Sequence, residues 1–334
     1  MGRERFMFLR DDYFFDDSER IWLVIMNSHP QDRVFAVLKY VPSSDSSVTL
    51  WRGKYRRLMD GYFPSQIIDT IGYNEISEFR FYSDVYETQF TAVPKKRINK
   101  HLKPENKTQE IIKRRNETKD PLELTCIQLI DLFKDKLLIP TTHIGIGGSI
   151  LCNIHMPFSN ISAIIYGEGN AKKFYENIKN LVANYENSSF RTLKFPSYTP
   201  IPEGSLNKRV NTWLYFNEKN LVIHFNVERN TPLQKYGSEN YKNIKPITIK
   251  GRIFNVLNGL TTRNYKFEPE NHELPIERII IYGGPWKSIM FKEGETVQVK
   301  GLLQEIITQE NKEKRYQIIL GTQETIQEYL VPTE

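Results

Sequence analysis

Cysteine and histidine are scarce in this chain of 334 residues, which contains two of the first and six of the second. Cys126 and Cys152 do not form a Cys-x-x-Cys pair, so neither a disulfide framework nor a cysteine zinc site is expected. The histidines are scattered and include no His-x-x-His or His-Glu-x-x-His set. We therefore expect no resident metal and no other cofactor.

Long apolar runs are also missing. No uninterrupted apolar segment approaches the roughly 20 residues that span a bilayer, and the first residues, MGRERFMFLRDD, contain no apolar signal region. With 39% hydrophobic and 26% charged residues, the composition is typical of a globular protein with two or three domains. The sequence predicts a soluble cytoplasmic protein with no membrane partner.

Positive charge is concentrated in one segment. The formal net charge is +6, but residues 95–119 contain ten Lys or Arg and three Glu, a local net of +7, so the rest of the chain sums to −1. With little apolar content, this segment is interpreted as a basic linker or a solvated helix. Because clustered cations neutralise phosphates, the segment is also a candidate nucleic-acid contact, through Lys95, Lys96, Arg97, Lys113, Arg114 and Arg115.

Residues 1–94 predict an α+β domain that is rich in aromatic side chains. Residues 21–26 and 34–41 are β-branched runs joined by a turn-prone connection, which indicates a hairpin. Four nearby acids surround an aromatic cluster and are interpreted as solvated, in preference to a cation site: Asp11, Asp12, Asp16 and Asp17.

Residues 51–57, WRGKYRR, interleave cations with aromatic rings. The pattern fits a strand with an exposed basic face. It also fits binding of RNA or single-stranded DNA, with cations on phosphates and rings on bases. In that second interpretation the contacts are Arg52, Lys54, Arg56 and Arg57.

Residues 120–140 carry the signals of a helix, with Asp120 as N-cap, Pro121 at the first position and Glu123 at the capping-box position. Residues 142–167, THIGIGGSILCNIHMPFSNISAIIYG, then predict a strand, a glycine turn, a short helix, a loop and a second strand. Small residues between a strand and a helix leave backbone N–H groups for a phosphate. The candidate phosphate or nucleotide site is Gly147, Gly148 and Ser149, and the alternative is a turn with no ligand.

This stretch resembles the nucleotidyltransferase fold of DNA polymerase β, in which a Gly-Ser turn precedes a strand of the form Asp-x-Asp by about ten residues. Gly148-Ser149 matches the turn, and residues 159–162 match the strand. The line GSI, His155, Pro157 and the ending Tyr-Gly resemble the archaeal family of predicted nucleotidyltransferases, over most of the chain. That resemblance implies a nucleotidyltransferase-like domain at residues 120–235, but Asn160 and Ser162 replace both catalytic aspartates.

From residue 244 to residue 334 the pattern becomes all-β. Alternating runs that contain internal glycines resemble a small barrel of the OB type, which commonly binds nucleic acid. Residues 245–334 contain twelve basic and twelve acidic side chains, so this region has no electrostatic signature of its own. Trp286 is expected to plug the barrel end rather than to stack on a base.

Three functions are compatible with these observations. The first is a catalytically degenerate nucleotidyltransferase-fold protein that binds nucleic acid, RNA rather than DNA. The second is an active nucleotidyltransferase that holds Mg²⁺ with other carboxylates, such as Glu168 or Glu228. The third is a structural adaptor that binds protein partners through its barrel. In the first case metal-dependent catalysis is not expected, because paired aspartates on one strand face are what holds the metals.

Overall fold

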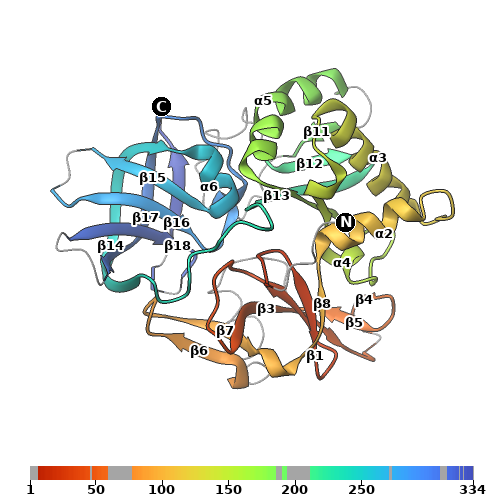
Figure 1. The fold of residues 1–334 in the computed structure, drawn as a ribbon, viewed down its shortest axis with the longest axis horizontal. Helices are drawn as coiled ribbons and strands as arrows, with labels where there is room; N and C mark the ends of the chain where they lie inside the picture. Colours follow the sequence, from red (N-terminus) through yellow and green to blue (C-terminus); the bar gives the residue numbers. More distant parts are fainter. Residues whose placement is uncertain are drawn as a thin grey trace.

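The protein is a mixed α+β structure built on three sheets, which lie around a common centre (Figure 1). Among the helices that are described, none is long and apolar enough to cross a membrane. The computed structural model describes residues 7–45, 47–58, 77–185, 190–193, 211–270, 273–308, 314–322, 324–325 and 327–333.

The first sheet has eight strands, all of which lie between residues 13 and 102. The hairpin expected from residues 21–26 and 34–41 is confirmed, because β2 and β3 pair antiparallel. The short 3-10 helix η1 (Ser77–Phe79) leads into its outer pair β6 and β7. The main path runs β4 (Leu50–Trp51), β5 (Tyr55–Arg57), β3 (Arg33–Pro42), β2 (Ile21–Val24), β1 (Tyr13–Asp16), β8 (Ile98–Leu102), and β3 also pairs with β7 (Thr88–Pro94), which pairs with β6 (Arg80–Ser83).

Three of the four acids near β1 are buried, so their interpretation as solvated acids is wrong. Asp12 is fully buried and its Oδ2 lies 2.8 Å from Nε2 of His101. Asp16 accepts a hydrogen bond of 2.7 Å from Nε of Arg20. Asp11 is 7% exposed. Neighbouring strands supply the partners, and a buried carboxylate is tolerated when it is paired in this way.

Residues 95–119 differ from the expected linker or solvated helix. They form the 3-10 helix η2 (Lys95–Arg97), strand β8, which pairs with β1, and helix α2 (Pro104–Lys113). Lys107 on α2 is 2% exposed, and its Nζ donates 2.7 Å to Oδ1 of Asn153. The segment packs despite its low apolar content because paired charges replace apolar contacts on one helix face.

The second sheet, which we call the central sheet because it is formed by the middle of the chain, mixes parallel and antiparallel pairs. Its strands follow the order β11 (Phe190–Thr192), β12 (Trp213–Phe216), β13 (Lys219–Asn226), β10 (Ile161–Tyr166), β9 (Ile144–Ile146). Strand β10 is parallel to β13 and antiparallel to β9. The expected strand, turn, short helix and strand are all present, since η3 (Thr141–His143) precedes β9 and α4 (Gly148–Leu151) precedes β10.

Two helices cover one face of the central sheet, α3 (Pro121–Lys136) and α5 (Glu168–Tyr185). Alternate side chains of β10 point toward them, because Ile161, Ala163 and Ile165 share one core with Phe133 of α3 and Phe174 of α5. Asp120 caps α3 as expected and accepts from the N–H groups of residues 122 and 123.

The third sheet closes on itself as a ring. Strands pair in the order β14 (Asn240–Phe254), β15 (Asn264–Pro269), β16 (Ile276–Ile281), β18 (Arg315–Leu320), β17 (Glu295–Ile307), and β17 pairs again with β14, while β19 (Tyr329–Pro332) adds to β17. Helix α6 (Val256–Thr262) and η4 (Pro285–Ser288) lie between strands. Trp286 is 1% exposed inside this ring, as its position beside a turn predicted.

Gly251 in β14 permits a close approach between strands, and its replacement tests the ring. A Cβ at Gly251 would lie 2.4 Å from the Phe267 ring and 2.5 Å from the backbone oxygen of Glu268. We expect Gly251→Ala to lower the free energy of unfolding by about 1–3 kcal/mol, because the strand must shift to relieve the contact. Denaturant unfolding measures this.

The matched control is Gly169→Ala at the start of α5, where no atom lies within 4 Å of the added Cβ. This change should be neutral or stabilise the protein by up to about 1 kcal/mol. An equal loss of stability in both variants would contradict the strand contact as the cause.

Candidate functional site

The glycine turn lies directly against β10. Gly147 ends β9, and its N–H donates to the backbone oxygen of Ser162 at 2.8 Å. Gly148 has a φ of +66°, which favours glycine, and a Cβ there would lie 3.2 Å from Oγ of Ser162. The turn and Ser162 are therefore in contact, although the two are more than ten residues apart in sequence. One of the three amides expected for a phosphate is already used.

The remaining turn amides belong to the first turn of α4. Gly148 and Ser149 open this helix, and the N–H groups of a first turn have no partner within the helix. The side chain of Ser149 is buried, with 6% of the residue exposed. Helix α4 is only four residues long. The turn is thus a narrow, mostly covered feature and not an open cradle.

Ser162 and Asn160 lie on the face of the sheet that α3 and α5 leave uncovered. Ser162 is followed on this face by Ile164 and Tyr166, and the register of the parallel pair places Val222 and His224 beside Ser162 and Ile164. Asn160, just before the strand, is exposed. In the resembled family this is where paired carboxylates would project, and here both side chains are neutral.

Other acids do not replace them. Glu168 and Glu228 follow the far ends of β10 and β13, while the glycine turn touches the start of β10. Six residues of strand separate the two ends by roughly 20 Å. Oε2 of Glu228 lies instead 3.2 Å from Nε2 of His143. Within the described residues, no group of three His, Cys, Asp or Glu side chains could hold a metal ion.

The basic strand of residues 51–57 is a hairpin. Strands β4 and β5 are joined by Arg52, Gly53 and Lys54, and the first two of these have positive φ. Arg52 and Lys54 are exposed at its tip. Arg56 and Arg57 are half-buried, and the guanidinium of Arg57 lies 6.0 Å from the ring centre of Trp51.

This hairpin contacts the loop between α4 and β10. The backbone N–H of Arg52 points to Sδ of Met156 at 3.3 Å. The rings of Trp51 and Phe158 meet edge to face, with centres 5.7 Å apart. Phe158 is 56% exposed, which is unusual for so large an apolar side chain. We call Trp51, Arg52, Lys54, Met156, Phe158 and Asn160 the hairpin–loop surface.

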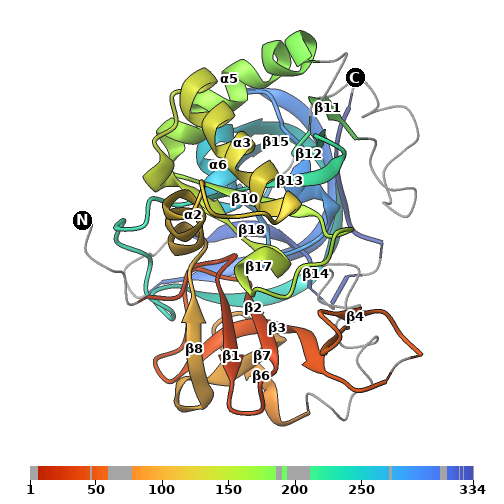
Figure 2. The same ribbon diagram turned by 90° about the vertical axis from the view of Figure 1, so that its right-hand side faces the viewer.

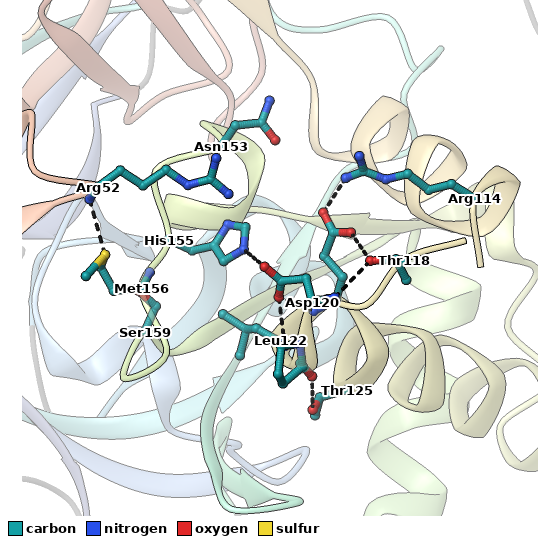
Figure 3. A network of polar contacts seen from close by, with 12 residues as sticks. Arg52, Arg114, Thr118, Asp120, Leu122, Thr125, Asn153, His155, Met156 and Ser159 are labelled. Atoms are coloured by element: carbon teal, nitrogen blue, oxygen red, sulfur yellow. Dashed lines mark hydrogen bonds and ion pairs between the residues drawn. The ribbon is translucent and has the colours of Figure 1, made fainter. Parts of the chain in front are cut away.

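A paired histidine and aspartate lie beside this surface. Nε2 of His155 lies 2.8 Å from Oδ2 of Asp120, and His155 is 6% exposed. Figure 3 shows the pair between Arg52 on one side and Arg114 on the other. Burial alone would raise the pKa of Asp120, but the hydrogen bonds from His155 and from the N–H groups that it caps outweigh burial and lower the pKa.

The sequence pattern predicted His155 as a packing or hydrogen-bonding residue without identifying its partner. Asp120 is 35 residues away and was recognised only as a helix cap. Phe158 was also missed, because a single aromatic in a polar loop carries no periodic signal. The one sequence signal for its exposure was its position between Pro157 and Ser159, in a segment typical of a surface loop.

The other candidate cations lie on two further elements and are partly neutralised. Lys95 and Lys96 are exposed on η2, whereas Arg97 binds Asp17 at 2.7 Å. Lys113 is exposed at the end of α2. Arg114 pairs with Glu123, and Arg115 pairs with Asp131. Figure 2 shows β8 rising from the lower edge of the first sheet to α2, so the two groups of cations lie at different places. The local charge of +7 is therefore not one continuous strip.

No protein-family model and no solved structure matches this chain. The chain is similar to the uncharacterized protein MJ1086 of Methanocaldococcus jannaschii, with 23% identity over 340 residues that cover 95% of this chain and 97% of the relative. Because the relative is archaeal, the similarity agrees with the resemblance to an archaeal family. The relative is uncharacterized, so the similarity indicates no activity or substrate.

Asp120 is expected to stabilise α3 in a pH-dependent way. Asp120→Ala should lower the free energy of unfolding at pH 7 by about 1 kcal/mol, because the helix loses its cap. A folded-state pKa below the ordinary value contributes stability above the ordinary carboxyl pKa and loses it as pH falls through the folded-state pKa. The cost of the substitution should therefore shrink in acid, as measured by urea unfolding at several pH values.

The control is Asp120→Asn, which keeps a capping oxygen and removes the charge. It should cost less than Asp120→Ala at pH 7. A cost that stays constant from pH 7 into strong acid would contradict a role for the charged carboxylate.

Proposed function

We propose that this protein binds single-stranded nucleic acid, RNA in preference to DNA, on the hairpin–loop surface. The observation that carries the proposal is the contact of the β4–β5 hairpin with the α4–β10 loop, which joins exposed cations to an exposed aromatic ring. Arg52 and Lys54 are placed to neutralise phosphates. Phe158, supported at its edge by Trp51, is placed to stack on a base.

We also propose that the central part of the chain is a nucleotidyltransferase-like module without metal-dependent catalysis. Its support is the order of elements, the parallel β10–β13 pair, the helices on one face and the glycine turn against Ser162. Asn160 and Ser162 lack the charges that attract divalent metal, each worth roughly 4 kcal/mol per unit of cation charge near a protein surface. Mg²⁺ belongs only to the alternative of an active enzyme, which the distant positions of Glu168 and Glu228 disfavour.

We further propose that the ring of residues 244–334 is an OB-type barrel. Numbered along the chain from β14 to β18, its strands follow the closed order 1-2-3-5-4-1, and the third and fifth strands, β16 and β18, are parallel. A closed five-stranded Greek-key barrel has this character. Because its charge is balanced, the barrel is proposed to assist nucleic-acid binding and not to be its main contact. The alternative is that the barrel binds protein partners, and binding assays distinguish the two.

Neutralising the hairpin tip tests the binding surface. Arg52→Gln with Lys54→Gln should weaken binding of a fluorescent oligo(U). It should also make the negative slope of log K against log salt shallower by about 1.4, because each phosphate contact to a single strand contributes about −0.7. Oligo(dT) should bind more weakly than oligo(U). Fluorescence anisotropy at several salt concentrations measures both.

The charge-matched control is Lys172→Gln with Lys179→Gln, two exposed lysines on α5. It should leave the salt slope unchanged. Lys95→Gln with Lys96→Gln separately tests the cations of η2. Equal slopes for the hairpin variant and the α5 variant would refute the hairpin as the phosphate contact and favour the adaptor hypothesis.

Phe158→Ala tests stacking on the same surface. Because Phe158 is mostly exposed, the variant should keep its melting temperature and bind oligo(U) roughly tenfold more weakly, as expected for the loss of about 1–3 kcal/mol of stacking. Phe158→Tyr should retain most of the affinity. Unchanged affinity in Phe158→Ala would remove this residue from the interface.

The absence of catalysis is tested by restoring carboxylates. Wild-type protein should show no magnesium-dependent heat on titration with MgATP. Asn160→Asp with Ser162→Asp should gain magnesium-dependent binding, because it restores two carboxylates at alternate positions, one of them beside the glycine turn. Tight magnesium-dependent binding by the wild type would overturn the proposed loss of the metal site.

A further inference from the structure

A cavity of about 240 Å³ lies where the three sheets meet. Its walls come from the segment after β2, the segment after β13, strand β14, the end of α6 and strand β16. Asn226 at the end of β13 pairs with Tyr166 at the end of β10, so the cavity and the glycine turn lie toward opposite ends of this strand pair. It is thus a second site, independent of the hairpin–loop surface.

The described lining of the cavity contains two arginines, Arg10 and Arg263, and no Asp or Glu. Arg10 is 4% exposed. Its Nη2 donates to the backbone oxygens of Phe225 at 2.6 Å and Thr261 at 2.8 Å, which holds the guanidinium in place. Nη1 of Arg263 donates to the oxygen of Tyr282 at 3.4 Å. Two guanidinium groups are therefore held beside one cavity whose lining is otherwise largely apolar.

Asp11 lies beside the arginine that lines the cavity. Nε of Arg10 lies 3.6 Å from Oδ2 of Asp11. Against burial, which raises it, neighbouring positive charges that include Arg263 lower the pKa of Asp11. Burial, with repulsion from Arg263 second, lowers the pKa of Arg10 to about 9. An anion bound between Arg10 and Arg263 offsets the repulsion between the two guanidinium groups.

Three tyrosines stand among the aliphatic residues of the wall. Tyr86, Tyr241 and Tyr282 all line the cavity. The rings of Tyr86 and Tyr241 are nearly parallel, at 5° with centres 5.5 Å apart, and Tyr282 meets Tyr86 edge to face. Flat rings of this kind suit a planar group. The volume is just below the usual range for small-molecule pockets, so the cavity suits one small ligand.

We propose that this cavity binds a small organic phosphate with a planar ring, of the size of a nucleoside monophosphate. The phosphate lies between Arg10 and Arg263, where the two guanidinium groups can donate to its oxygens. The ring lies against Tyr86 and Tyr241. The rest of the polar lining is Asn27, Ser28, Gln234, Thr262 and Asn264. Nothing in this assignment depends on RNA binding.

Calorimetric titration of the full chain with four probes tests the proposal. AMP and UMP carry both a planar base and a phosphate. Ribose 5-phosphate lacks the planar base, and adenosine lacks the phosphate. At least one monophosphate should bind with a Kd tenfold or more below those of ribose 5-phosphate and adenosine. The proposal is overturned if neither monophosphate binds at millimolar concentration, or if either partial probe binds equally well.

Two substitutions then locate the site. Arg263→Gln should weaken monophosphate binding at least tenfold, whereas Lys266→Gln, a matched charge change at an exposed position of β15, should leave it unchanged. Asn264→Asp adds a negative charge to the lining and should weaken binding even if Arg263→Gln fails to fold. Oligo(U) binding should be unaffected in Asn264→Asp. Equal monophosphate affinity in Asn264→Asp and wild type would refute this location.

Discussion

Arg10 is the residue through which the three sheets are joined. Its backbone N–H binds the Asn27 side chain of the first sheet region, and its backbone oxygen accepts from Asn226 at the end of β13. Its guanidinium reaches Phe225 in the central sheet and Thr261 in α6 of the ring, positions more than 200 residues away in sequence. A buried guanidinium needs acceptors for its donors, and the central sheet and α6 each supply one to Nη2 of Arg10. Through these hydrogen bonds, Arg10 contacts each of the three units that Figure 1 shows around one centre.

This junction explains why the uncovered face of the central sheet is not an open cleft along its whole length. Toward the ends of β10 and β13, the N-terminal segment packs Leu9 against Ile164 and Tyr166, and Asp11 lies 3.4 Å from His224. Toward the start of the same strands, Asn160 stays exposed and the basic hairpin approaches. One pair of strands thus separates the surface proposed to bind nucleic acid from the cavity proposed to bind a small anion.

The local part of the candidate site was predictable, and its assembly was not. The glycine turn and the cap at Asp120 each depend on a few neighbouring residues, so their patterns identify them. The pairing of His155 with Asp120 and the contact of Trp51 with Phe158 join residues that are 35 and 107 positions apart, and no periodicity reports such contacts. The basic segment illustrates the opposite error. The local charge of +7 is correct, but carboxylates from other segments neutralise part of it. Asp17 and Glu78 pair with Arg97, and Asp131 pairs with Arg115.

The sequence by itself determined the helices that are capped, the strands with alternating apolar residues and the absence of carboxylates at Asn160 and Ser162, because these properties belong to single residues or to neighbours within one turn. Only the tertiary structure decided that β17 closes the ring by returning to β14, that β8 and α2 are packed elements, and that Asp11, Asp12 and Asp16 are buried. The physical reason is that burial and pairing depend on which distant segments meet. Their free energy is shared between partners that are far apart in the chain, so it leaves no mark on either segment alone.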